Sequence, residues 1–138
     1  MRASIVVLLG GLFASSALAA RSEWSGVWRD ARGGKPYSEV RTIDDGGGDV
    51  EFQLDLWGGP PANNSGGMEG HVSTKGGKTA FETKEFGALC RIEFTFSSRQ
   101  LILRQVLGSP ADCGFGNGIL AEGTFIRISR KAPIFVHR

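Results

Sequence analysis

The sequence is poor in the residues that most often carry out chemistry. It has two cysteines, two histidines and one tyrosine among 138 residues. The histidines, His71 and His137, are far in sequence from the cysteines, Cys90 and Cys113. A nucleophilic cysteine needs a base beside its thiol, and a zinc site needs paired ligand spacings. The sequence therefore predicts neither an enzyme nor a metal centre, and we expect no cofactor.

The sequence also lacks blocks of like charge. Its formal net charge is +2, and acidic and basic residues are interspersed. Proteins that bind nucleic acid or anionic membranes concentrate basic residues on one surface. Such partners are therefore not expected. Beyond the first residues there is no apolar run near the roughly 20 residues that a membrane-spanning helix needs, so we expect no membrane span.

The N-terminus has the pattern of an export signal. Met1-Arg2 supplies a positive charge, residues 4–13 are apolar, and Ala17-Leu18-Ala19 is a small-x-small cleavage pattern. We expect cleavage after Ala19, with Ala20 as the alternative position. The apolar run is too short for a span, although an uncleaved anchor helix is a second interpretation. Residues 1–19 are thus a predicted signal peptide, and the protein is expected in the periplasm or secreted.

The remaining residues, 20–138, are enough for one domain with one core. In an oxidising compartment an even number of cysteines indicates pairing. We therefore predict a Cys90–Cys113 disulfide, which closes a loop of about 22 residues and contributes about 3 kcal/mol. The glycines at 114, 116 and 118 follow Cys113. A phosphate-binding loop would open a helix, whereas a strand pattern follows here, which favours a tight turn held by the disulfide.

Short runs of alternating apolar and polar residues recur along the chain, and glycine-rich turns separate them. The clearest begin at Val50 and Cys90. Strands are expected at 24–28, 37–43, 50–56, 71–74, 79–83, 90–96, 101–106 and 118–128, with a bend at Gly123 and an edge strand in the C-terminal tail. About eight strands with short connections predict an all-β protein, a small antiparallel up-and-down barrel. A two-sheet β-sandwich is the alternative.

The longest expected loop, residues 58–70, is the best candidate for recognition, because long loops in small domains are often functional. Trp57 precedes it and should face away from the core if the alternation of 50–56 continues. An outward tryptophan is a plausible contact anchor. The candidate binding residues are Trp57, Pro60, Pro61, Asn63, Asn64 and His71.

The stretch Trp24-Ser-Gly-Val-Trp28 resembles the Gly-x-Trp signature in the first strand of lipocalin-type barrels. In that family the tryptophan closes the base of the barrel and packs against an arginine of the last strand. The resemblance assigns these barrel-closing roles to Gly26, Trp28 and Arg127. Other small exported bacterial barrels, including periplasmic lysozyme inhibitors, are similar in general appearance.

Two functions follow from these patterns. The first is a non-catalytic exported binding protein of inhibitor or immunity type, whose loops recognise a protein or cell-envelope partner. The second is a lipocalin-like carrier of a small apolar ligand. An eight-stranded barrel is either just filled by side chains or holds one small ligand. The expected inward residues are large, which favours the first function: Phe52, Leu54, Leu56, Ile92, Phe94, Phe96, Leu101 and Leu103.

We predict that the exported protein begins at Ala20 and has no free thiol. Its intact mass should therefore lie about two mass units below that of the reduced chain. Mass spectrometry before and after reduction measures both features. Free thiols in the native protein would contradict the disulfide.

Overall fold

The computed structural model describes residues 23–34 and 36–136; the predicted signal peptide and His137 lie outside them. The described residues are all-β, as predicted, apart from one short 3-10 helix. In order, the elements are β1 (Gly26–Asp30), β2 (Glu39–Asp44), β3 (Asp49–Trp57), β4 (Ser65–Ser73), β5 (Lys78–Thr83), β6 (Cys90–Phe96), β7 (Gln100–Leu107), η1 (Ala111–Cys113) and β8 (Gly123–Ser129). Within the described residues, no helix has the length and apolar character to cross a bilayer.

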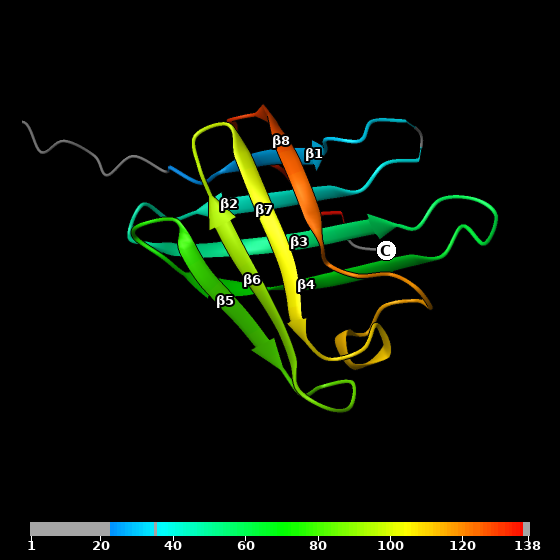
Figure 1. The fold of residues 1–138 in the computed structure, drawn as a ribbon. Coiled ribbons are helices and arrows are strands. Elements are labelled where there is room, and N and C mark those ends of the chain that lie inside the picture. Colours follow the sequence, from blue (N-terminus) through cyan, green and yellow to red (C-terminus); the bar gives the residue numbers. More distant parts are fainter. Residues whose placement is uncertain (1–22, 35, 137–138) are drawn as a thin grey trace, which may run out of the picture.

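All eight strands belong to one antiparallel sheet in the order β4-β3-β2-β1-β8-β7-β6-β5. The first and last strands pair with each other, so the sheet curls into a nearly closed barrel. Figure 1 shows β5–β8 crossing in front of β1–β4. The barrel prediction is confirmed, and the two-sheet sandwich does not hold because a single sheet supplies every strand.

Large side chains fill the interior. Alternation along each strand sends one set of residues inward, and β6 shows this without interruption, from Cys90 to Phe96. Phe52 and Phe94, from opposite halves of the sheet, bring their ring centroids to 4.9 Å. The largest fully buried side chains are Trp28, Phe52, Phe94, Phe125, Leu54, Ile92, Leu101 and Leu103.

The expected loop over 58–70 is wrong beyond residue 64, because Ser65 begins β4. The inward positions of this strand include Gly66 and Gly70, so it shows little apolar alternation. Rings from elsewhere occupy the space that side chains would take. A Cβ at Gly66 would lie 2.7 Å from the Phe115 ring, and one at Gly70 would lie 2.7 Å from the Phe81 ring.

Two expectations near the C-terminus are also wrong. Residues 118–122 form no strand, and β8 begins at Gly123. Ile119 and Ala121 are buried instead, and both belong to the hydrophobic core. The tail over 130–136 adds no edge strand. Its Val136 backbone donates to Gln53 Oε1 and accepts from Gln53 Nε2, so a side chain of β3 holds it.

The pairing of β1 with β8 depends on Gly26. This residue has φ +155°, and a Cβ there would lie 2.2 Å from the Ser129 carbonyl oxygen. No other residue fits without moving the last strand. The neighbouring register pairs Trp28 with Arg127 after a bulge.

We predict that Gly26→Ala lowers the free energy of unfolding by about 2–4 kcal/mol, from backbone strain and the clash with β8. Urea denaturation measures the loss. Gly76→Ala is the matched control, because no atom lies within 4 Å of its Cβ position; it should change stability by less than about 0.5 kcal/mol. Equal effects of the two variants would contradict the role of Gly26.

Candidate functional site

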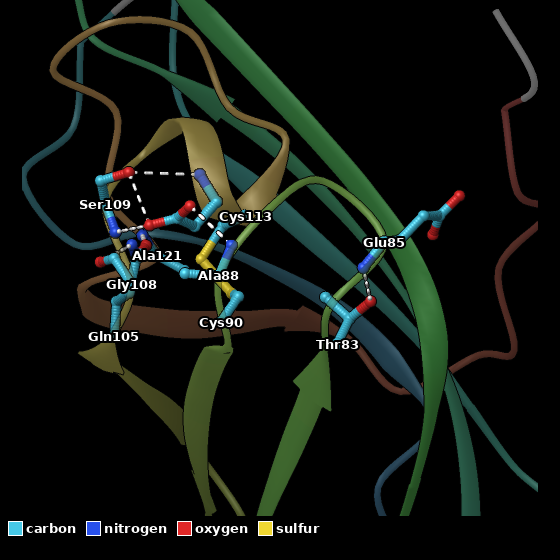
Figure 2. Close-up of a disulfide and its surroundings, with 10 residues drawn as sticks. Thr83, Glu85, Ala88, Cys90, Gln105, Gly108, Ser109, Cys113 and Ala121 are labelled. Atoms are coloured by element: carbon cyan, nitrogen blue, oxygen red, sulfur yellow. Dashed lines mark hydrogen bonds between the residues drawn. A yellow bond between two sulfur atoms is a disulfide. The ribbon is translucent and has the colours of Figure 1, made fainter.

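The predicted disulfide is confirmed, and both of its cysteines belong to the hydrophobic core. Cys90 and Cys113 are bonded with their Cα atoms 5.2 Å apart, and both are fully buried. The bond joins the start of β6 to η1 (Figure 2). The following residue, Gly114, has φ 75°, and Phe115 beyond it is buried against β4. The glycine turn is therefore architectural.

Asp112 organises the same loop through backbone amides. Its carboxylate accepts hydrogen bonds from the Ser109 amide and hydroxyl, both at 2.9 Å, and from the Ala88 amide at 3.0 Å. These bonds, those from Ser109 first, hold the pKa of Asp112 below its ordinary value. The carboxylate thus ties the loop before β6 to η1 beside the disulfide.

Trp28 and Arg127 lie in contact, as in the arrangement that the lipocalin resemblance implies. Trp28 is fully buried and donates from Nε1 to Thr42 Oγ1 at 2.8 Å. The Arg127 guanidinium carbon lies 4.7 Å from the Trp28 ring centroid. Arg127 also donates to the carbonyl oxygens of Glu23, Ser25 and Ser98. Burial lowers its pKa, with a smaller contribution from Arg130.

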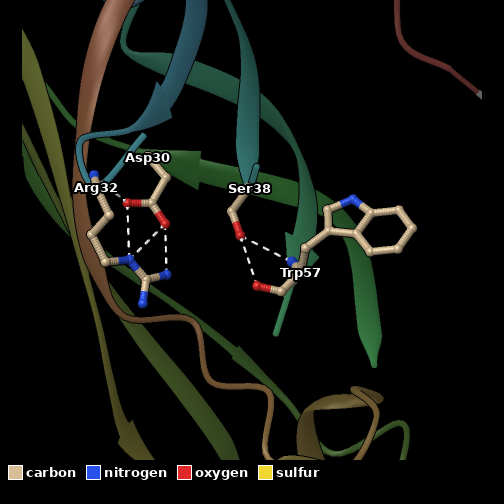
Figure 3. A network of polar contacts seen from close by, with 4 residues as sticks. All are labelled: Asp30, Arg32, Ser38 and Trp57. Carbon is tan, nitrogen blue, oxygen red and sulfur yellow. Dashed lines mark hydrogen bonds and ion pairs between the residues drawn. The ribbon is translucent and has the colours of Figure 1, made fainter. Parts of the chain in front are cut away.

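Trp57 lies at the end of β3, on the outer face. Its amide donates to Ser38 Oγ at 2.9 Å, which anchors the backbone of β3 to the start of β2. Figure 3 shows the indole pointing away from Ser38 and from the nearby Asp30–Arg32 pair. The hydrogen bond with Arg32 is the main cause that lowers the pKa of Asp30. The outward direction expected for Trp57 is therefore what the structure has.

The loop after Trp57 is short and internally braced. The Gly58 amide donates to the Asn64 carbonyl, and the Asn63 amide donates to the Gly59 carbonyl, both at 2.9 Å. The Pro60-Pro61 peptide bond is cis. Asn64 Nδ2 donates to the Asn117 carbonyl at 2.7 Å. This bond joins the loop to the glycine turn that follows the disulfide.

His71 does not join this loop. It lies in β4 opposite Glu51, and its Nδ1 is 3.6 Å from Asp49 Oδ2. Asp49 starts β3, whereas Trp57 ends it, so a strand length separates His71 from the other candidates. Residues 65–70, which were expected to be loop, form the strand between them.

The outer face of β1–β3 has a feature that the sequence did not reveal. Glu39 forms ion pairs with both Arg29 and Arg41, and only 9% of its side chain is exposed. The Arg29 guanidinium lies 3.9 Å from the Tyr37 ring centroid. Trp57 lines the same shallow groove. The sequence signal for these ion pairs is the set of charged outward residues in 37–43. Any solvent-exposed strand face has the same pattern, so the signal is not specific.

A second cleft, of about 500 Å³, adjoins this groove and lies between β4 and β5. Arg41 and Asp55 line both. We call the first the outer groove and the second the seam cleft. The groove has Tyr37 and Trp57 beside an ionic floor, and the cleft has an apolar floor beside a strand edge.

Among the described residues, no group of three or more histidine, cysteine, aspartate or glutamate side chains is arranged to hold a metal ion. In the aspartate turn after β2, Asp45 Oδ1 accepts from the Gly47 and Asp49 amides. Asp44 accepts from the Trp24 and Gly46 amides. These carboxylates are used to shape the turn.

Comparison with known proteins gives no match to a protein-family model, a curated protein or a solved structure.

We predict an acid-induced loosening of the loop at Asp112. Because the folded-state pKa of Asp112 lies below its ordinary value of 3.8, its hydrogen bonds contribute fully above that value. Their contribution is lost as pH falls through the folded-state pKa. The amide proton shift of Ala88, followed by NMR during acid titration, should report this step. In Asp112→Asn the step should be absent; its persistence would assign it to another group.

Proposed function

We propose that this protein is an exported, non-catalytic binding protein that recognises another macromolecule, of protein or cell-envelope origin, with its outer surface. The observation that carries the proposal is the filled interior. Trp28, Phe52, Phe94 and Phe125 have at most 1% of their surface exposed. Space that a carrier would keep for its ligand is taken by these rings.

The outer groove supports recognition from outside. Tyrosine, tryptophan and arginine are the residues that most often dominate binding energy at protein interfaces. Here Arg29 of β1 and Trp57 of β3 lie beside Tyr37, which precedes β2. Ion pairs between Glu39 and its two arginines hold the floor in place before any partner arrives, which lowers the entropy cost of binding.

A lipocalin-like carrier is the second candidate. The contact of Trp28 with Arg127 favours it, because the resemblance implies that pair. A carrier would also need an enclosed cavity; aromatic rings fill the centre of this barrel, and the cleft of about 500 Å³ opens at the seam between β4 and β5. We therefore rank carriage of a small apolar ligand below recognition of a macromolecule.

We predict that the mature protein, used as bait in a cell-envelope extract from its own source, retains a specific macromolecular partner. Trp57→Ala should weaken retention of the partner about tenfold or more, because it removes an aromatic side chain that the partner would bury. Ile128→Ala is the control: this residue is 49% exposed on β8, outside the groove. Quantitative mass spectrometry measures how much partner is retained by the wild-type protein, by Trp57→Ala and by Ile128→Ala.

Native mass spectrometry of the exported protein separates the two candidates. A bare chain is expected. A small molecule that accompanies the folded protein and leaves on unfolding would overturn macromolecular recognition in favour of carriage.

A further inference from the structure

The C-terminal tail, residues 130–136, crosses part of the barrel after the last strand. It leaves β8 at Ser129, which is paired with Val27 of β1. The ladders place Val27 opposite Arg41 of β2, and Arg41 opposite Gln53 of β3. Two hydrogen bonds join the tail to Gln53. The tail therefore starts at β8, passes β1 and β2, and is held on β3.

Gln53 belongs to the outer face of β3. Phe52 and Leu54, on either side of it in the chain, are buried in the core, so the alternation of the strand directs Gln53 outward. The next outward residues, Glu51 and Asp55, are partly exposed, whereas Gln53 is only 6% exposed. The tail backbone and the side chains bonded to Gln53 cover it. Gln53 is thus a polar side chain enclosed on the outside of the barrel.

Two charged neighbours fix the orientation of the Gln53 amide. Arg41 Nη1 donates to Gln53 Oε1 at 3.3 Å, and Gln53 Nε2 donates to Glu69 Oε1 at 2.6 Å. Arg41 and Glu69 stand opposite Gln53 on the two adjacent strands. A reversed amide would set its NH2 group against the guanidinium and its oxygen against the carboxylate. The orientation of the amide therefore does not depend on the tail.

Held in this orientation, the Gln53 amide offers one acceptor and one donor to the tail. The Val136 N–H donates to Oε1 at 3.1 Å, and Nε2 donates to the Val136 carbonyl at 2.7 Å. In an extended chain the N–H and C=O of one residue point to the same side, as in antiparallel pairs that exchange both bonds. A primary amide matches these two groups whatever side chain the residue carries. Gln53 therefore binds extended main chain.

The apolar side chains of the tail contribute little to its attachment. Ile134 is 89% exposed and Val136 is 53% exposed, while Phe135 between them is partly buried. Apolar surface that stays in water gains nothing from the hydrophobic effect. Hydrogen bonds between neutral groups contribute modestly, because water can replace either partner. A segment held in this way can be replaced by another that offers the same main-chain groups.

The Gln53 amide adjoins the outer groove. Arg41, which is bonded to it, lines both the outer groove and the seam cleft, and so does Asp55, the next outward residue of β3. Trp57 follows two residues further along the same face. Val136 itself lines the seam cleft. The tail therefore lies beside the surface proposed for recognition, where a partner bound at Trp57 would meet it.

We propose that the Gln53 amide binds an extended main-chain segment of a protein partner, and that the C-terminal tail occupies this site until the partner's segment replaces it. Recognition of the main chain admits many sequences, but it excludes proline at the bonded residue. A tethered tail competes at an effective concentration of about millimolar, so release of the tail should raise affinity. This inference rests on the proposed function and assigns the element by which the partner binds.

The first test releases the tail in the intact mature protein. Val136→Pro removes the N–H that donates to Gln53, and Val136→Ala keeps it and is the matched control. The probe is the synthetic peptide Ala-Pro-Ile-Phe-Val-His-Arg, which copies residues 132–138. NMR titration, followed at the Gln53 side-chain amide, should give at least about fivefold tighter binding by Val136→Pro. Equal binding by the two variants, or binding by neither, would overturn the proposal.

The second test distinguishes main-chain recognition from side-chain recognition, with Val136→Pro as the receptor. A peptide with an ester in place of the Phe–Val peptide bond lacks the N–H and should bind at least about fivefold more weakly. A peptide with alanine in place of valine keeps the N–H and should bind within about twofold of the original. A loss with alanine as large as the loss with the ester would overturn main-chain recognition.

The third test changes the receptor. Gln53→Glu, combined with Val136→Pro, replaces the donor Nε2 by an acceptor and should weaken peptide binding at least about fivefold. Attraction between the new charge and the basic peptide would act in the opposite direction. Gln100→Glu, the same change on β7, is the matched control and should leave binding unchanged. Equal binding by the two variants would overturn the site at Gln53.

Partner capture separates this inference from the proposed function. A partner lost by Trp57→Ala and retained equally by Val136→Pro and Val136→Ala overturns the site at Gln53 and leaves macromolecular recognition standing. Self-association of the wild-type protein that Val136→Pro abolishes would identify the tail of a second copy as the occupant, and would also overturn the proposal. Peptide binding with the expected variant pattern supports it whether or not the extract yields a partner.

Discussion

The filling of a small barrel by large side chains is the constraint on which the rest of the structure depends. Phe52, Phe94 and Phe125 meet in the interior together with Trp28. Rings of this size leave no space for side chains at every facing position. Gly66 and Gly70 lie where the Phe115 and Phe81 rings pass. The glycines of β4 are therefore a consequence of the aromatic core, whose rings lie against the backbone there.

The two places where β1–β4 meets β5–β8 differ. Where β1 meets β8, Gly26 allows close approach, and Arg127 covers Trp28 and bonds three carbonyls. That junction is closed. Between β4 and β5, the disulfide-held turn places Phe115 beside Gly66, which closes one end of the gap. Elsewhere along the gap, no ladder joins β4 to β5 among the described residues. Under the proposed function, the filled interior leaves recognition to the outer surface.

Sequence patterns predicted the parts of this fold in which local alternation matches burial. Residues 50–56 and 90–96 alternate without interruption, and both are strands. The pairing of the two cysteines followed from their number and the expected export. β4 was missed because long-range contacts with Phe81 and Phe115 determine its glycines, and no local pattern records them. The same holds for Ile119 and Ala121, which are buried without belonging to a strand.

The candidate site could be predicted only in part. Trp57 was identified because it ends an alternating strand, and it lies on the outer face as expected. The outer groove beside Trp57 could not be predicted, because Arg29, Tyr37 and Glu39 become neighbours only when β1 and β2 pair. Likewise, the seam cleft combines residues from β3, β4 and the loop after β5. Contacts between strands, rather than spacing along one strand, define both surfaces.

The most direct measurement of the open seam is amide hydrogen exchange along β4 in the free protein, resolved by NMR. Gly66 and Gly70 direct their amides toward β3 and should exchange slowly. His71 directs its amide toward the seam, where no ladder joins β4 to β5 among the described residues, and this amide should exchange at least about tenfold faster. Protection of His71 equal to that of Gly70 would mean that β4 is paired on both sides in solution, and would contradict an open seam.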